Sequence, residues 1–272
     1  MRSVKQKKRN IMSGIYLLPN LITTAALYCG IMSIMSSLKG HDLQRAAYYI
    51  LLATVFDFLD GYVARASKTC SSFGMEYDSL SDVIAFGVAP ASLFYSSFLI
   101  NLKRIGVGAV FIFVACAALR LARFNSKIEG EEKVAFRGLP TTAAAAFLSS
   151  FFLILNRFQL DWLYSLIPMI MIIISFLMVS SLKYPAVSGI QIWKKKPFFY
   201  LGLVIIIIGL IFFFKELSIF VISSAYVSVG LYERIKNFQF MKRWKVRSEE
   251  KGSRDSSLSE KAFDEDLETE GE

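Results

Sequence analysis

Long apolar runs separated by short polar connections fill most of this chain. Each run is long enough to cross a bilayer as a helix, which takes about 20 residues. The first run is longer than the apolar part of a signal peptide, so we expect it to be a retained span. The pattern predicts an all-α protein, a polytopic membrane helical bundle of about eight transmembrane helices, roughly at 15–38, 46–66, 80–100, 104–124, 139–156, 160–180, 198–215 and 217–235.

Polar composition marks what lies outside the bundle. Residues 1–14 form a basic arm, and residues 15–236 hold all the apolar runs. Residues 237–272 begin as a basic stretch and end in an acidic, serine-rich segment with few apolar residues, which is typical of a disordered tail. The tail is either a solvating extension or a regulatory, partner-binding arm.

Overall composition narrows the class of protein. The 272 residues are 54% hydrophobic, with a mean hydropathy of +0.47 and a formal net charge of +9. A chain this apolar is a poor candidate for nucleic-acid binding, and its basic residues suit anionic membrane lipids instead. Cys29, Cys70 and Cys116 are scattered and form neither a disulfide framework nor a metal-ligand cluster.

The distribution of Lys and Arg predicts the orientation. An even number of spans puts both termini on one side, and most basic residues between spans fall on that same side. Basic loops stay in the cytoplasm, so we expect cytoplasmic termini in a multi-pass protein of a bacterial-type cytoplasmic membrane. A homodimer is also expected.

Four carboxylates at the cytoplasmic ends of the second and third runs are the main candidate for chemistry. Asp57 and Asp60 are three residues apart, and Asp78 and Asp82 are four apart, so each pair lies on one face of its helix. Carboxylates at membrane depth are costly and usually functional. An oxygen-rich pocket suits hard divalent cations, and we expect two Mg²⁺ or Mn²⁺ ions held by these four residues.

Residues next to the carboxylates fit a ligand site. Gly61 and Ala64 leave room on the same helix as Asp60, and Gly74 is expected in the turn between the two helices. Arg65 is placed to contact a phosphate, or else serves as a basic membrane anchor. The acids alone also fit a structural polar network, or an ion pathway in a divalent-cation transporter.

The segment from Asp57 to Asp82 resembles the signature of the CDP-alcohol phosphotransferase family. All nine specified positions of Asp-x2-Asp-Gly-x2-Ala-Arg-x8-Gly-x3-Asp-x3-Asp are filled. The resemblance implies transfer of a phosphatidyl-type group from a CDP-linked lipid to an alcohol, with release of CMP. It implies metal binding by the first three aspartates and a role as base for Asp82, near the metals. The residues implied at the CDP site are Asp57, Gly61, Ala64, Arg65, Gly74 and Asp78.

Shorter segments resemble the branch of this family that uses serine. They begin at Leu18, Arg120, Phe136, Met178 and Lys183. The resemblance implies CDP-diacylglycerol and L-serine as substrates; glycerol 3-phosphate or inositol as acceptor is the nearest alternative. A serine carboxylate would need cations, and we expect serine contacts from Arg120, Arg123, Asn125 and Lys183, which otherwise serve as membrane anchors.

Overall fold

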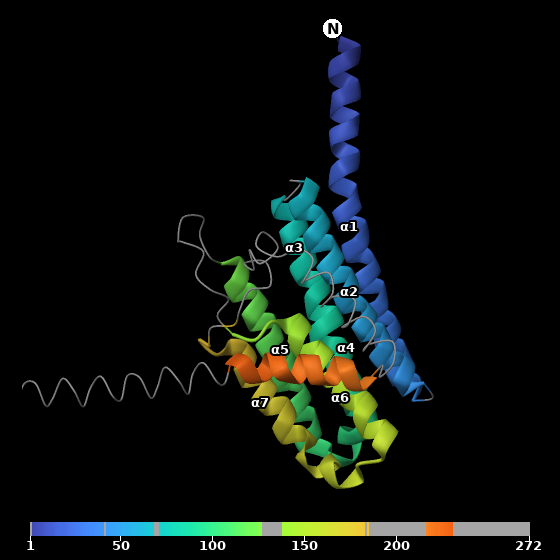
Figure 1. Cartoon of the computed structure of the whole chain (residues 1–272), viewed down its shortest axis with the longest axis vertical. Helices are drawn as coiled ribbons and strands as arrows, with labels where there is room; N and C mark the ends of the chain where they lie inside the picture. Colours follow the sequence, from blue (N-terminus) through green and yellow to red (C-terminus); the bar gives the residue numbers. More distant parts are fainter. Residues whose placement is uncertain are drawn as a thin grey trace, which may run out of the picture. The chain divides into compact units, whose positions relative to one another are not determined.

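The computed structural model describes residues 2–40, 42–67, 71–126, 138–182, 184 and 216–230. Every regular element in these ranges is helical (Figure 1). The α-helices are α1 (Arg2–Lys39), α2 (Leu43–Ser67), α3 (Ser72–Asp82), α4 (Ala89–Phe94), α5 (Lys103–Asn125), α6 (Thr141–Phe158) and α7 (Ile167–Val179), and a further helix spans Glu216–Gly230. Short π-helical and 3-10 segments join several of them: η1 (Val83–Val88), η2 (Tyr95–Leu99), η3 (Ile100–Leu102) and η4 (Asp161–Leu166).

Five helical stretches in the described ranges are long and apolar enough to cross a membrane. Their mean hydropathies lie between 1.3 and 2.3 over an 18-residue window. The stretches are Leu18–Lys39, Leu43–Ser67, Ser72–Asn125, Thr141–Phe158 and Trp162–Val179. The predicted all-α membrane bundle is therefore confirmed as a fold class.

The stretch Ser72–Asn125 is 54 residues long and folds back on itself. The reversal falls at Lys103, whose backbone has φ 45°. Ser79 bonds to Asn125 at one end of the pair, and Gly87 faces Ala117 in the middle. Gly106 packs against the carbonyl of Leu99, where a Cβ would collide. The spans predicted at 80–100 and 104–124 are thus the two arms of an antiparallel hairpin.

The last two predicted spans are less fully described. The seventh, at 198–215, lies outside the described residues, as do the loop before α6 and the acidic tail. Part of the eighth is present as the helix Glu216–Gly230, which is shorter than the roughly 20 residues that a span needs. The count of eight stays a prediction.

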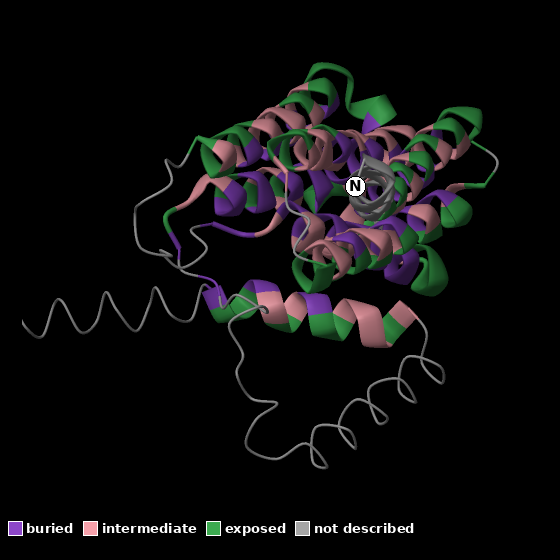
Figure 2. Cartoon of the chain, turned by 90° about the horizontal axis from the view of Figure 1, so that it is seen from above, coloured by how far each residue is buried: buried purple, intermediate pink, exposed green. Residues whose placement is uncertain are grey.

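Small residues let the helices of the core approach closely. A Cβ on Gly30 of α1 would lie 2.7 Å from the Cα of Ala85 in η1, so only glycine fits there. Ala46, Ala47 and Ala53 on α2 are also fully buried. Such residues are typical of helix contacts inside membranes. Figure 2 shows the buried positions on the inner faces of the helices and the exposed ones outside.

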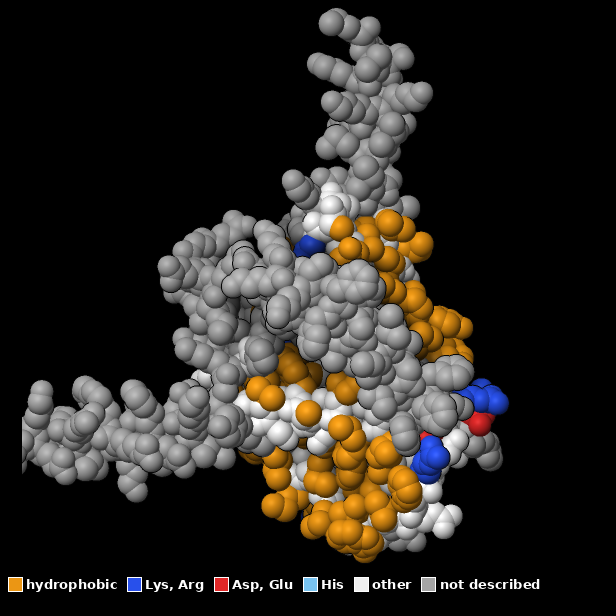
Figure 3. All heavy atoms as spheres, viewed as in Figure 1, with side chains coloured by type: hydrophobic (Ala, Val, Ile, Leu, Met, Phe, Trp, Pro, Cys, Tyr) orange, Lys and Arg blue, Asp and Glu red, His pale blue; other side chains and the backbone are white. Residues whose placement is uncertain are grey.

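The outward faces of the helices are apolar, as a lipid-facing surface requires. Leu21, Leu52, Phe111 and Phe176 are all exposed, and hydrophobic side chains cover much of the described surface in Figure 3. A soluble protein of this size would rarely expose so much apolar surface.

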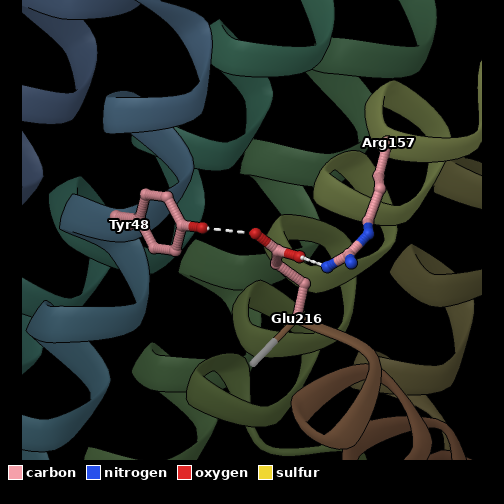
Figure 4. Close-up of polar contacts among 3 residues, drawn as sticks. All are labelled: Tyr48, Arg157 and Glu216. Carbon is pink, nitrogen blue, oxygen red and sulfur yellow. Dashed lines mark hydrogen bonds and ion pairs between the residues drawn. The ribbon is translucent and has the colours of Figure 1, made fainter. Parts of the chain in front are cut away.

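A polar cluster joins three helices (Figure 4). The Tyr48 hydroxyl on α2 donates to one oxygen of Glu216 at 2.6 Å, and Arg157 on α6 pairs with the other oxygen at 2.6 Å. Farther along, Ser150 and Ser223 are 3.2 Å apart, and Phe220 stacks on Phe151. These contacts fasten the helix Glu216–Gly230 along α6.

We expect Glu216→Gln to destabilise the fold by about 1 kcal/mol, because the amide keeps the shape but loses the charge that strengthens both bonds. Thermal unfolding in detergent measures the change. Asp42→Asn is the matched control, because Asp42 pairs with Arg45 at the surface and both side chains are more than half exposed. Equal unfolding temperatures for the two variants would contradict the assigned role.

Candidate metal centre and active site

Three of the four predicted aspartates form one cluster. Asp57 and Asp60 come from α2 and Asp78 comes from α3. Each offers a carboxylate oxygen, and these oxygens all lie within 4.8 Å of one another. Asp60 is 5% exposed and the other two are half-buried. The i,i+3 spacing on α2 and the packing of α1 against α2 and α3 bring the group together.

The cluster fits a divalent cation. Three negative charges in a half-buried site repel one another and need compensation. One oxygen of Asp78, Oδ1, is buried and has no hydrogen-bond partner within the described ranges. A buried carboxylate oxygen without a hydrogen-bond partner, next to other carboxylate oxygens, is suited to act as a ligand of a divalent cation. The three aspartates could therefore hold a metal ion.

Asp82 borders the cluster but is not one of the three convergent aspartates. It lies one helical turn beyond Asp78 and outside the group whose oxygens converge. Its carboxyl group is within hydrogen-bonding reach of Asp57. The π-helical η1 begins directly after it, and π-helical turns inside helices occur often at functional sites. The position leaves Asp82 beside the metal ligands without making it one of the convergent three.

The start of α3 corrects one sequence-based expectation. Ser71 caps the helix, and its hydroxyl accepts the backbone N–H of Gly74 at 3.0 Å. Gly74 thus lies in the first turn of α3, and its predicted place in the turn between the helices is wrong. A Cβ at Gly74 would lie 3.1 Å from the Ser71 hydroxyl and 3.3 Å from Asn20, so the glycine makes room where α1 meets α3.

The guanidinium of Arg65 lies next to Gly61, near the position that a side chain would occupy there. A Cβ at Gly61 would be 3.4 Å from Nη1 of Arg65. The guanidinium also interacts electrostatically with Asp57 and Asp60. Gly61 and Ala64 sit on the same turn of α2 as the cluster. This geometry places a cation next to the carboxylates at the end of α2.

Sequence reasoning missed Thr23. This buried residue of α1 donates a hydrogen bond to Oδ2 of Asp60 at 2.8 Å. The bond fixes one oxygen of a candidate metal ligand from a third helix. The only signal in the sequence was a hydroxyl inside an apolar run, a position where hydroxyls more often bond to their own helix.

The residues predicted to contact an acceptor lie in different places relative to the aspartates. Arg120 interacts electrostatically with Asp82 and Asp57, and its Nη1 donates to the Thr141 hydroxyl at 3.0 Å. Arg123 is exposed and its Nη1 reaches the carbonyl of Val179 at 3.4 Å.

Asn125 donates to Ser79 and Glu76, which ties the end of α5 to α3. Lys183 lies outside the described residues. Of the described three, only Arg120 borders the aspartates.

The fold and the site define a class: a membrane-type helical bundle that gathers aspartates from two helices into a cluster that could hold a cation. The sequence model of the CDP-alcohol phosphatidyltransferase family matches residues 16–181 of this chain. The chain therefore belongs to that family.

Curated relatives agree with this. A CDP-diacylglycerol–serine O-phosphatidyltransferase of Helicobacter pylori is 34% identical over 219 residues, which cover 80% of this chain and 90% of the relative. An archaetidylserine synthase of Methanothermobacter thermautotrophicus is 41% identical over 174 residues, 63% of this chain and 71% of the relative. The serine O-phosphatidyltransferase of Methanocaldococcus jannaschii is 41% identical over 165 residues, which cover 60% of this chain and 75% of the relative.

We expect Thr23→Val to raise the divalent-metal concentration needed for half-maximal activity by roughly 10-fold, because Asp60 loses the donor that orients it. Activity titrations with Mg²⁺ and Mn²⁺ measure the shift. Thr54→Val is the matched control, since the Thr54 hydroxyl bonds only to carbonyls of its own helix. A metal requirement unchanged in Thr23→Val would show that Thr23 does not orient the ligand.

Proposed function

We propose that this chain transfers the phosphatidyl group of CDP-diacylglycerol to the hydroxyl of L-serine, which yields phosphatidylserine and CMP. The observation that carries the proposal is the convergence of Asp57, Asp60 and Asp78 with Asp82 beside them. The family membership supports the reaction class. The names of the relatives, several of which are serine O-phosphatidyltransferases, support serine as acceptor.

The proposed cofactor is Mg²⁺ or Mn²⁺, with two ions shared among the aspartates. Divalent ions bound there would neutralise charge on the pyrophosphate and on the departing CMP. Asp57, Asp60 and Asp78 supply the convergent oxygens, and Thr23 holds Asp60 in place. Arg65, over Gly61, is positioned to contact a phosphate of the nucleotide.

Asp82 is the proposed base. As the serine hydroxyl oxygen forms a bond to the phosphorus that bears diacylglycerol, the bond from that phosphorus to the CMP oxygen breaks. The hydroxyl proton passes to the carboxylate of Asp82, and CMP leaves with the electron pair of the broken bond. Asp57 and Arg120 both interact with the Asp82 carboxyl group, which keeps it beside the cluster as the proton acceptor.

The lipid would reach this site sideways from the bilayer. Phe58 and Tyr62, on the same helix as the first two aspartates, are 57% and 60% exposed. Phe73 on α3 is exposed as well and stacks with Tyr77. An apolar surface beside the cluster suits acyl chains that stay in the membrane while the CDP head enters. We also propose that the active site faces the cytoplasm and that the protein forms a homodimer.

Asp82→Asn should retain CDP-lipid binding and lose turnover by at least about 100-fold, the usual scale for removal of a positioned base. Single-turnover CMP release and a separate lipid-binding assay give the two quantities. Asp60→Asn is the contrasting variant, because loss of a metal ligand should raise the metal requirement or abolish turnover. A near wild-type rate in Asp82→Asn would show that the proton goes elsewhere.

The acceptor is tested by CMP release from purified enzyme with CDP-diacylglycerol and a panel of alcohols. L-Serine should be used, while glycerol 3-phosphate and inositol should be poor substrates. Release with one of those two but not with serine would defeat the acceptor assignment and leave the reaction class intact. Divalent-cation transport without CMP release under any condition would instead support a transporter.

A further inference from the structure

Tyr184 carries a buried hydroxyl that no described group satisfies. The residue is 1% exposed, and its hydroxyl oxygen has no hydrogen-bond partner in the part of the chain that the structure describes. Its ring stacks on Tyr226 with centroids 5.6 Å apart. A phenylalanine would make the same ring contact without stranding a polar group. A buried polar atom without a partner in a folded protein calls for an explanation, such as a bound ligand.

The stranded hydroxyl belongs to a chain of polar groups that leads to the aspartates. Tyr226, from the helix Glu216–Gly230, interacts electrostatically with both Tyr184 and Arg120. Arg120 in turn interacts with Asp82 and Asp57. The Nε of Arg120 is also buried and has no hydrogen-bond partner among the described residues. Tyr184 and Arg120 thus each carry an unsatisfied buried polar atom, and Tyr226 interacts with both residues.

These atoms have the chemistry of a carboxylate site. A guanidinium and phenolic hydroxyls are donors, and an anionic carboxylate accepts from several donors at once. The groups come from α5, from the segment after α7 and from the helix Glu216–Gly230, so they meet only when these three parts of the chain are assembled. Arg120, which also interacts with Asp82, links this group of donors to the proposed base.

We propose that Tyr184, together with Arg120 and Tyr226, forms the subsite for the carboxylate of the acceptor, and that the Tyr184 hydroxyl donates a hydrogen bond to it. The proposal rests on the proposed function and deepens it, because it assigns the choice of acceptor to residues outside the aspartate cluster. A site built around a hydrogen bond rejects analogues that cannot complete it, since its polar groups then stay unpaired.

Tyr184→Phe tests the proposal directly. The KM for L-serine should rise roughly 10-fold or more, as expected for loss of a hydrogen bond to a charged group. The KM for CDP-diacylglycerol should not change. The thermal midpoint should stay the same or rise, because the removed hydroxyl has no partner among the described residues. The preference for serine over ethanolamine, which lacks the carboxylate, should fall in the variant.

Tyr95→Phe is the matched control. Tyr95 lies on η2, where it lines a pocket with Lys103 and Arg104 at the turn of the hairpin, more than three helical turns beyond Asp82. The Tyr95→Phe variant should have the same KM for L-serine as the wild-type enzyme. An unchanged serine KM in a folded Tyr184→Phe protein would overturn the proposal and leave the hydroxyl to a buried water. A wild-type enzyme that does not use serine at all would instead overturn the proposed function.

Discussion

Mutual repulsion among four carboxylates enclosed by apolar helices is the constraint on which this structure depends. The carboxylate oxygens of Asp57, Asp60 and Asp78 lie within 4.8 Å of one another. At such a separation and an effective dielectric constant of about 20, each charged pair costs roughly 3 kcal/mol. Water, the usual remedy, is scarce at membrane depth. The cluster is stable only if cations and donors from the surrounding helices offset that cost. Thr23, Arg65 and Arg120 approach from three different helices, and a divalent ion would supply the rest.

The fold places those groups through close helix packing. Gly30 allows α1 to touch η1 at Ala85, three residues after Asp82 in the chain. The Ser71 cap and Gly74 let α3 begin beside α1. The hairpin at Lys103 returns α5 along α3, which brings Arg120 back to the aspartates. Glu216, held by Tyr48 and Arg157, fastens the helix that carries Tyr226. Packing far from the aspartates thus decides which polar groups reach them.

The parts of the account that follow from local spacing could be predicted from the sequence. Apolar runs gave the membrane-type helices, and the i,i+3 and i,i+4 spacings put the aspartates on two facing surfaces. Thr23 and Tyr184 could not be singled out, because their roles depend on contacts between residues far apart in the chain. The incorrect prediction for Gly74 has a related cause. A glycine considered by its local sequence alone suggests a turn, but here it allows a close contact between helices. The side chain of Asn125 is chemically able to bind an acceptor alcohol, yet it donates its hydrogen bonds to Ser79 and Glu76.

Direct metal binding tests the central claim. Purified wild-type protein, freed of metal and kept without substrate, should bind Mn²⁺ in a titration followed by electron paramagnetic resonance. Asp60→Asn and Asp78→Asn should weaken that binding strongly, whereas Asp42→Asn, which removes an exposed carboxylate from the surface pair with Arg45, should not. Equal Mn²⁺ binding by the wild type and both cluster variants would contradict the assignment of the aspartates as a metal centre.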